Sequence, residues 1–194
     1  NPTVALPTKT AQGSPSIGAF TSNITGLSQN TLYYVRAYAT NTAGTVYGDE
    51  VTFTTLLLPT VTTQAVTDIT ITTATGNGNI TNLGVPNATV YGVVWDTTSN
   101  PTIALVTKTT QSTPPTGAFT SSITGLTAGM LYHVRAYATN AAGTSYGGDV
   151  TFTAHLAPIV TTQSVTSIGT ATATGNGNVT VLGVPNPTQH GVVW

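Results

Sequence analysis

The chain has 194 residues, of which only 5% are charged, and its net charge is -1. This charge balance excludes a basic surface for nucleic acid and a polybasic patch for anionic lipid, and the absence of cysteine excludes disulfides and thiolate metal ligands. No apolar run approaches ~18 residues, so we expect no membrane insertion by this segment. A surface with so few charges favours association between molecules, because the repulsion between them is weak.

The chain contains almost two copies of one 99-residue sequence repeat. Residues 1–95 align with residues 100–194 without a gap, and most of the paired residues are identical, down to Trp95 and Trp194. A repeat of this length is a whole small domain rather than one rung of a solenoid. We therefore expect a tandem array of domains, an arrangement that serves reach, adhesion or scaffolding more often than catalysis.

Taken in chain order, the complete copy carries strand signals throughout and almost no helix signals. Runs rich in Thr, Val, Ile and Tyr are bounded by Gly, Pro and Asn, which is typical of strands and turns. The predicted strands are residues 61–67, 69–81, 90–96, 118–123, 131–140 and 145–153, and residues 97–116 are predicted to be a loop with one short edge strand. Seven short strands joined by polar turns predict an all-β fold, an antiparallel β-sandwich.

Two glycines interrupt the inward face of the second predicted strand. Gly76 and Gly78 occupy neighbouring inward positions in its period-2 pattern. Inward positions without side chains leave room for a large neighbour, and Trp95 is the only Trp of the complete copy. We therefore predict that the Trp95 ring lies over Gly76 and Gly78. The matching set in the other copy is Trp194, Gly175 and Gly177.

A motif in the second half of the repeat carries a family resemblance. The segment Leu126-Thr-Ala-Gly-Met-Leu-Tyr132, followed by His-Val-Arg-Ala-Tyr-Ala-Thr-Asn-Ala-Ala-Gly143, resembles the E–F corner and the F strand of fibronectin type III domains. In that family the Tyr lies six residues after a Leu and its hydroxyl bonds back to the main chain, forming a tyrosine corner. Leu27 and Tyr33 repeat the motif in the first copy. The resemblance implies tandem fibronectin type III or immunoglobulin-like sandwiches, arranged head to tail.

The nearer likeness is to fibronectin-type repeats of bacterial secreted and surface proteins, and it covers the whole repeat. It implies a secreted or cell-surface protein. The chain departs from the usual fibronectin pattern because Trp95 lies in the third predicted strand rather than the second. It also has no Arg-Gly-Asp, so integrin-type adhesion is not implied.

The alignment with this family places the domain boundaries. Residues 58–154 are predicted to be a complete repeat, residues 1–57 the C-terminal part of a preceding one with its last four strands, and residues 155–194 the N-terminal part of the next with its first three. Each partial repeat would expose an apolar face and bare strand edges, which soluble proteins avoid. Two explanations stay open: covalent continuation in a longer array, and completion between chains, which would propagate a filament.

A row of polar and aromatic residues marks the predicted outward face of the strongest strand. Arg36 lies between Tyr34 and Tyr38, and Arg135 lies between His133 and Tyr137. The predicted face comprises Arg36, Tyr38, Arg135 and Tyr137. A guanidinium stacked across aromatic rings would stiffen the sheet, and we favour this structural role. The functional alternative is a surface that contacts sugars.

Four segments match the acceptor pattern for N-linked glycans, at Asn23, Asn79, Asn87 and Asn178. Such matches arise by chance in a chain rich in Thr and Asn, so glycosylation at these residues stays open, as does sugar linked to Thr.

No pattern of catalytic or metal-binding residues recurs in the two copies. The three histidines are His133, His155 and His190, and the other copy has Tyr or Leu at each of these positions. Asp49-Glu50 is the one adjacent acidic pair, too few carboxylates for a calcium cluster. We therefore predict no enzymatic activity, no metal and no cofactor.

The sequence favours an extracellular structural repeat protein that forms a stalk, sheath or filament by self-association, head to tail. The alternative is an adhesin or carbohydrate-contacting spacer of a secreted protein, with glycans as partners. Binding of ice by Thr-rich faces is a third hypothesis, but it needs regular Thr-x-Thr rows, and those around Thr70-Ile-Thr-Thr are irregular.

Overall fold

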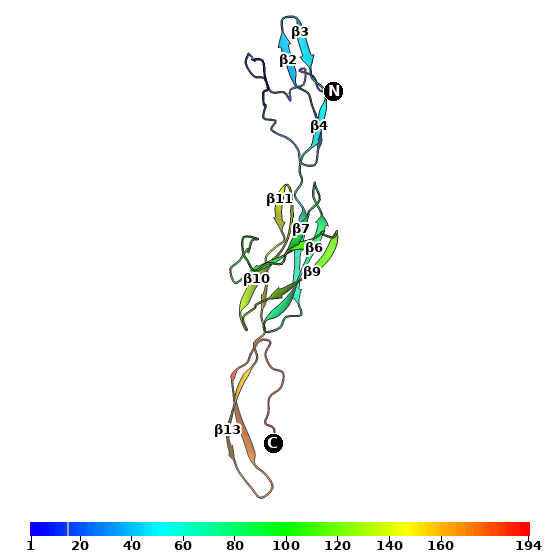
Figure 1. The fold of residues 1–194 in the computed structure, drawn as a ribbon. Coiled ribbons are helices and arrows are strands. Elements are labelled where there is room, and N and C mark those ends of the chain that lie inside the picture. Colours follow the sequence, from blue (N-terminus) through cyan, green and yellow to red (C-terminus); the bar gives the residue numbers. More distant parts are fainter. Residues whose placement is uncertain (15) are drawn as a thin grey trace. The chain divides into compact units, whose positions relative to one another are not determined.

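The computed structural model describes residues 1–14 and 16–194 (Figure 1). Fourteen strands and no helix lie in these residues, and all the strand pairs are antiparallel, which confirms the prediction of an all-β chain. The chain divides into two compact units, Asn1–Leu57 and Leu58–Trp194. The finer division into three parts, with a boundary at residue 154, stays a prediction.

Two sheets form the central part of the second unit. The first has the order β5-β6-β9, with bounds Thr60–Thr67, Thr73–Asn82 and Gly117–Thr124. The second has the order β11-β10-β7-β8, with bounds Gly143–Tyr146, Leu131–Asn140, Val90–Asp96 and Gln111–Ser112. The strand β12 (Val150–Thr153) also pairs with β10. The short β8 is the edge strand expected in the long loop.

The two sheets enclose one apolar core. On β6 the alternating residues Ala74, Gly76, Gly78 and Ile80 are buried, as their period-2 pattern predicted. The core residues from both sheets that are fully enclosed include Ile80, Ile123, Val93 and Val134, all 0% exposed. Residues from the two sheets thus form one cluster, as in a β-sandwich.

The last predicted strand, residues 145–153, is in fact two strands. Both β11 and β12 pair with β10, but their registers on it are offset by one residue. The offset is absorbed at Gly147, whose N–H donates to the carbonyl of Ala136 at 2.9 Å and whose backbone lies against Thr63. A side chain at Gly147 would collide with that neighbouring backbone, so the interruption in the strand coincides with a close approach between the sheets.

The second predicted strand also begins later than expected, at Thr73 rather than Ile69. Asp68 has a positive φ of 48°, and Thr70 accepts a hydrogen bond at its hydroxyl from the N–H of Thr73 at 2.9 Å. Hydroxyl-to-backbone bonds of this kind compete with a strand ladder and favour a turn.

The first unit contains four short strands that repeat part of this architecture. The strands β1 (Leu32–Val35) and β4 (Val51–Thr54) pair in the register of β10 with β12. The strands β2 (Tyr38–Asn41) and β3 (Gly44–Tyr47) pair in the register of β10 with β11. None of the described residues in 1–57 is buried.

Residues 155–194 form a hairpin of β13 (Ile159–Thr166) and β14 (Thr174–Val181), in the register of β5 with β6. The third strand predicted for this segment is not formed in residues 190–194. In the central sandwich the matching strand β7 is held between β10 and β8. The hairpin lacks such partners, and this explains the missing strand.

Candidate functional site

The tyrosine at the predicted corner is bonded back to the main chain in both copies. The Tyr132 hydroxyl accepts a hydrogen bond from the N–H of Thr127 at 3.0 Å, and the Tyr33 hydroxyl accepts one from Ser28 at 2.9 Å. The Tyr132 ring also stacks on Phe152, with centroids 5.7 Å apart. The preceding Leu126 is buried, so the corner is a structural element, and Leu27 at the matching position is half-buried.

The glycine track of β6 is covered by residues other than the predicted Trp95. A Cβ added to Gly78 would lie 2.5 Å from the ring of Phe119 and 2.7 Å from Ala136. A Cβ on Gly76 would lie 2.9 Å from Val93 and 3.1 Å from Ile123. The prediction chose the wrong residue of β7, because Val93 lies opposite Ala136 at the middle of the sheet and Trp95 lies two residues further along.

Phe119 is the aromatic residue that covers Gly78. It is the direct cross-strand partner of Gly78, so its ring folds over the glycine from the neighbouring strand of the same sheet. The ring then meets Tyr91 of the other sheet edge-on, at 4.8 Å between centroids. A pair of a glycine and an aromatic residue therefore joins the two sheets.

The predicted exposed tyrosine face is wrong for Tyr137. This side chain is only 2% exposed, and its hydroxyl donates to the carbonyl of Thr109 at 2.7 Å. The segment around Thr109 runs along β7, where the N–H of Thr109 donates to the carbonyl of Val93 at 2.9 Å. This segment covers the face of β10 that the strand pattern predicted to be exposed. Tyr137 is therefore unavailable as a platform for sugars.

The two arginines stack on tyrosines, but on the neighbouring strand. Arg135 lies with its Cζ 4.6 Å from the ring centroid of Tyr146, and its Nε donates to the carbonyl of Gly147 at 2.9 Å. Arg36 and Tyr47 repeat the stack at 4.7 Å. In that copy the Tyr38 hydroxyl donates to the carbonyl of Thr10 at 2.8 Å. Each guanidinium thus lies over a tyrosine ring of the neighbouring strand, a contact that can stiffen the sheet.

A hydrogen-bonded pair of side chains that the sequence did not indicate joins three segments of the second unit. His133 Nδ1 lies 2.9 Å from Asp149 Oδ2, which also accepts a hydrogen bond from the N–H of Asn100 at 2.8 Å. The first copy has Tyr34 and Glu50 at the two positions, so comparison of the repeats gave no signal for this pair.

Three of the possible glycosylation residues, Asn23, Asn87 and Asn178, are exposed, whereas Asn79 is half-buried on β6. Asn77, two residues before Asn79 on β6, has a structural role. Asn77 donates from Nδ2 to the carbonyl of Ala65 at 2.7 Å. This carbonyl lies where the pairing of β5 with β6 is irregular, so the side chain provides the hydrogen-bond partner there.

Among the described residues no group of three or more His, Cys, Asp and Glu is close enough to hold a metal ion. No helix with the length and hydropathy of a membrane span occurs in that same part of the chain.

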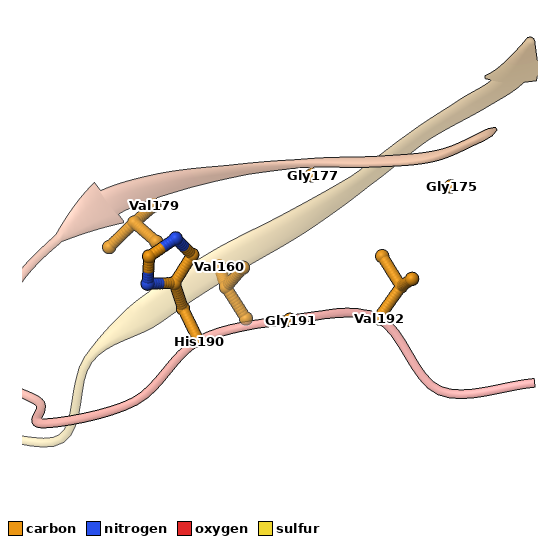
Figure 2. Close-up of a pocket in the computed structure, with 7 residues that line it drawn as sticks. All are labelled: Val160, Gly175, Gly177, Val179, His190, Gly191 and Val192. Carbon is orange, nitrogen blue, oxygen red and sulfur yellow. The ribbon is translucent and has the colours of Figure 1, made fainter.

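Two hollows with apolar walls lie in the described residues, one in residues 155–194 and one in residues 1–57. Figure 2 shows the first, between the β13–β14 hairpin and residues 190–192, with Val192 directed towards Gly175. Its lining residues are Val160, Gly175, Gly177, Val179, His190, Gly191 and Val192. The second, in the first unit, is lined by Phe20, Ala37, Tyr38, Ala39, Val46, Tyr47 and Gly48.

Matched residues of the repeat differ in their exposure to solvent. Phe119 is 8% exposed, whereas the matching Phe20 is 60% exposed. Ile123 is 0% exposed, whereas the matching Ile24 is 47% exposed. The same residue types are therefore buried in the central sandwich and exposed in the first unit. No protein-family model and no curated protein matches the chain.

Proposed function

We propose that the chain is a structural repeat protein of the cell exterior, in which fibronectin type III-like β-sandwiches follow one another head to tail. The array serves as a stalk, sheath or filament. It acts mechanically and not as an enzyme, and its partners are further copies of the same repeat.

The joint that follows the central sandwich is the observation that carries this proposal. The N–H of His155 donates to the carbonyl of Thr70 at 2.9 Å, and the N–H of Gly129 donates to Ala154 at 3.1 Å. One residue later, Leu156 and Val184 exchange two backbone hydrogen bonds of 2.9 and 2.8 Å. The chain thus passes from β12 to β13 without a free linker.

A joint that is bonded on both sides suits a load-bearing array. The Leu156 side chain adds packing to the hydrogen bonds, because it lies 3.2 Å from the position of a Cβ on Gly129. Bending at this joint would break backbone hydrogen bonds, whereas a Gly/Ser linker would bend freely. Tension would then pass from ladder to ladder along the chain.

The composition supports the same proposal. With 5% charged residues and a net charge of -1, neighbouring arrays repel each other weakly and can pack side by side. The runner-up function, a spacer that contacts carbohydrate, depended on exposed tyrosines, and Tyr137 is buried.

Immunogold electron microscopy tests the proposal. Antibodies raised against the complete chain should label regular appendages or a sheath on intact cells of the source organism. Label confined to the cell interior after permeabilisation would contradict a structural role at the surface.

A further inference from the structure

We infer that Thr63 is the residue that fixes the first strand of the complete sandwich to its second sheet, and that this contact sets the force at which the sandwich yields. We call the contact, formed by Thr63, Ala136 and Gly147, the latch. The inference rests on the proposed function, because a latch acts only in a chain that carries tension. It names the hydrogen bond that resists this tension.

The latch lies where one edge of β10 is not covered by a strand. The strand β12 pairs with β10 as far as Val134, and β11 pairs with it from Tyr137 onwards. Ala136 lies between these two stretches. Its carbonyl accepts the N–H of Gly147 at 2.9 Å, so the N–H of Ala136 still needs an acceptor on the same edge.

Thr63 supplies this acceptor from the other sheet. Its hydroxyl accepts a hydrogen bond from the N–H of Ala136 at 2.9 Å. Thr63 belongs to β5, the edge strand of the first sheet, where its ladder partner is Gly78 of β6. One side chain therefore bonds the edge of the first sheet to the middle of β10 in the second.

The backbone around this bond fits closely. A Cβ on Gly147 would collide with the backbone and the hydroxyl of Thr63, whereas a Cβ on Gly148 would meet no atom within 4 Å. The glycine at position 147 thus allows β5 to approach β10 closely enough for the hydrogen bond. Movement of Thr63 along β10 would also disturb this packing.

The chain enters and leaves the sandwich at opposite ends of β10. Leu58, before β5, has its Cδ2 3.3 Å from the position of a Cβ on Gly143, in the turn that follows β10. Ala154, after β12, donates its N–H at 3.0 Å to the carbonyl of Met130, the residue before β10. Tension along the array therefore pulls β5 towards one end of β10 and β12 towards the other.

Under this tension β5 must slide lengthwise past β10. The bond between Thr63 and Ala136 lies near the middle of both strands, so it opposes the sliding directly. Forced unfolding is governed by the unfolding rate, and an interaction that must break before β5 moves contributes to that barrier. A hydrogen bond outside this path adds to equilibrium stability and leaves the barrier under load unchanged.

Force spectroscopy of the complete chain tests the latch. The chain has no cysteine, so Leu56→Cys and Ala157→Cys, at exposed residues on either side of the sandwich, define two pulling points. In this background Thr63→Val keeps the branched shape of the side chain and removes the acceptor. At constant force it should shorten the lifetime of the folded sandwich about fivefold, the effect of losing one hydrogen bond.

Tyr137→Phe is the matched control, because it also removes one hydrogen bond of β10. The hydroxyl of Tyr137 donates to the carbonyl of Thr109 at 2.7 Å, in the segment along β7 and not in β5. Both variants should lower the melting temperature, whereas only Thr63→Val should shorten the lifetime under force. Equal shortening by the two variants, or none by Thr63→Val, would overturn the inference.

Two neighbouring glycines give an independent readout without force. Gly147→Ala should displace β5 and speed hydrogen exchange at the amides of residues 60–67, because the added Cβ collides with Thr63. Gly148→Ala, at an open position, should leave that exchange unchanged. The same exchange rate in both variants would contradict the close fit of β5 to β10.

The latch and the proposed function fail separately. Surface label on cells together with an unchanged lifetime of Thr63→Val would refute the latch and leave the structural array standing. A shortened lifetime of Thr63→Val together with label confined to the cell interior would support the latch and refute the surface role.

Discussion

At the scale of single residues, the core depends on an aromatic ring placed against a residue with no side chain. Gly78 faces Phe119 on the adjacent strand, and the ring reaches Tyr91 on the opposite sheet. The arrangement joins two sheets through one contact. Any atom added at the glycine must displace the ring, in a core where Ile80 and Val134 are fully enclosed.

We expect Gly78→Ala to lower the free energy of unfolding by about 1–3 kcal/mol, the usual cost of overpacking a core. Chemical denaturation followed by near-UV absorption of the tyrosines would measure it. Gly148→Ala, at an exposed glycine, is the control and should change stability by much less. Equal effects of the two variants would show that Gly78 is not crowded.

The corner tyrosine gives a second prediction at this scale. Tyr132→Phe removes the acceptor for the N–H of Thr127 and should cost about 1 kcal/mol. Tyr34→Phe, at a tyrosine that is 52% exposed, provides the comparison. If both variants had the melting temperature of the unmodified chain, the Tyr132 hydroxyl would contribute nothing measurable to stability.

The sequence predicted burial correctly where it depends on the pattern of one strand. It predicted contacts wrongly where they depend on how two layers pack together. The alternation of Ala74 and Ile80 with polar residues predicts a buried face because it is local to β6. The choice between Val93 and Trp95 depends on how the sheets are offset, which no single-strand pattern contains. Tyr137 was misplaced because the loop segment at residues 107–109, which has no strand pattern, covers it.

At the scale of elements, irregular strands are stabilised by side chains that the periodicity does not mark. The pairing of β5 with β6 shifts register between Gln64 and Thr67. Asn77 bridges this irregularity by donating to the carbonyl of Ala65 and to the hydroxyl of Thr67, at 2.7 and 3.2 Å. Asn176 makes the matching bonds in β13–β14, so the irregularity belongs to the repeat.

We predict that Asn77→Ala lowers the stability of the complete sandwich by about 1 kcal/mol, because the carbonyl of Ala65 loses its partner. Asn176→Ala removes the same bonds from the partial repeat and serves as the matched control. In calorimetry of dilute chains, the main transition should shift for Asn77→Ala and stay in place for Asn176→Ala. A shift for Asn176→Ala and none for Asn77→Ala would show that the main transition is the unfolding of the β13–β14 hairpin.

At the scale of the whole molecule, the chain has one closed core, and apolar side chains such as Phe20 and Ile24 are exposed outside it. Burial of such side chains is favourable, so it promotes association between molecules. Charge contributes little to such an arrangement, since 5% of the residues carry it. Assembly is therefore expected to follow apolar burial and strand pairing.

We predict that filament assembly changes little between low and high sodium chloride and is strengthened by sulfate, which favours the burial of apolar surface. Sedimentation at a series of salt concentrations would measure this. Dissolution of the filaments by moderate sodium chloride would show instead that ion pairs hold them.

The joint after the central sandwich has a further consequence. Leu156 and Val184 exchange two backbone hydrogen bonds, so their amide protons are protected from solvent. Deuterium should therefore enter these two amides more slowly than the amides of residues 190–194, which form no strand. Equal exchange at the two places would show that the joint opens freely and does not transmit load.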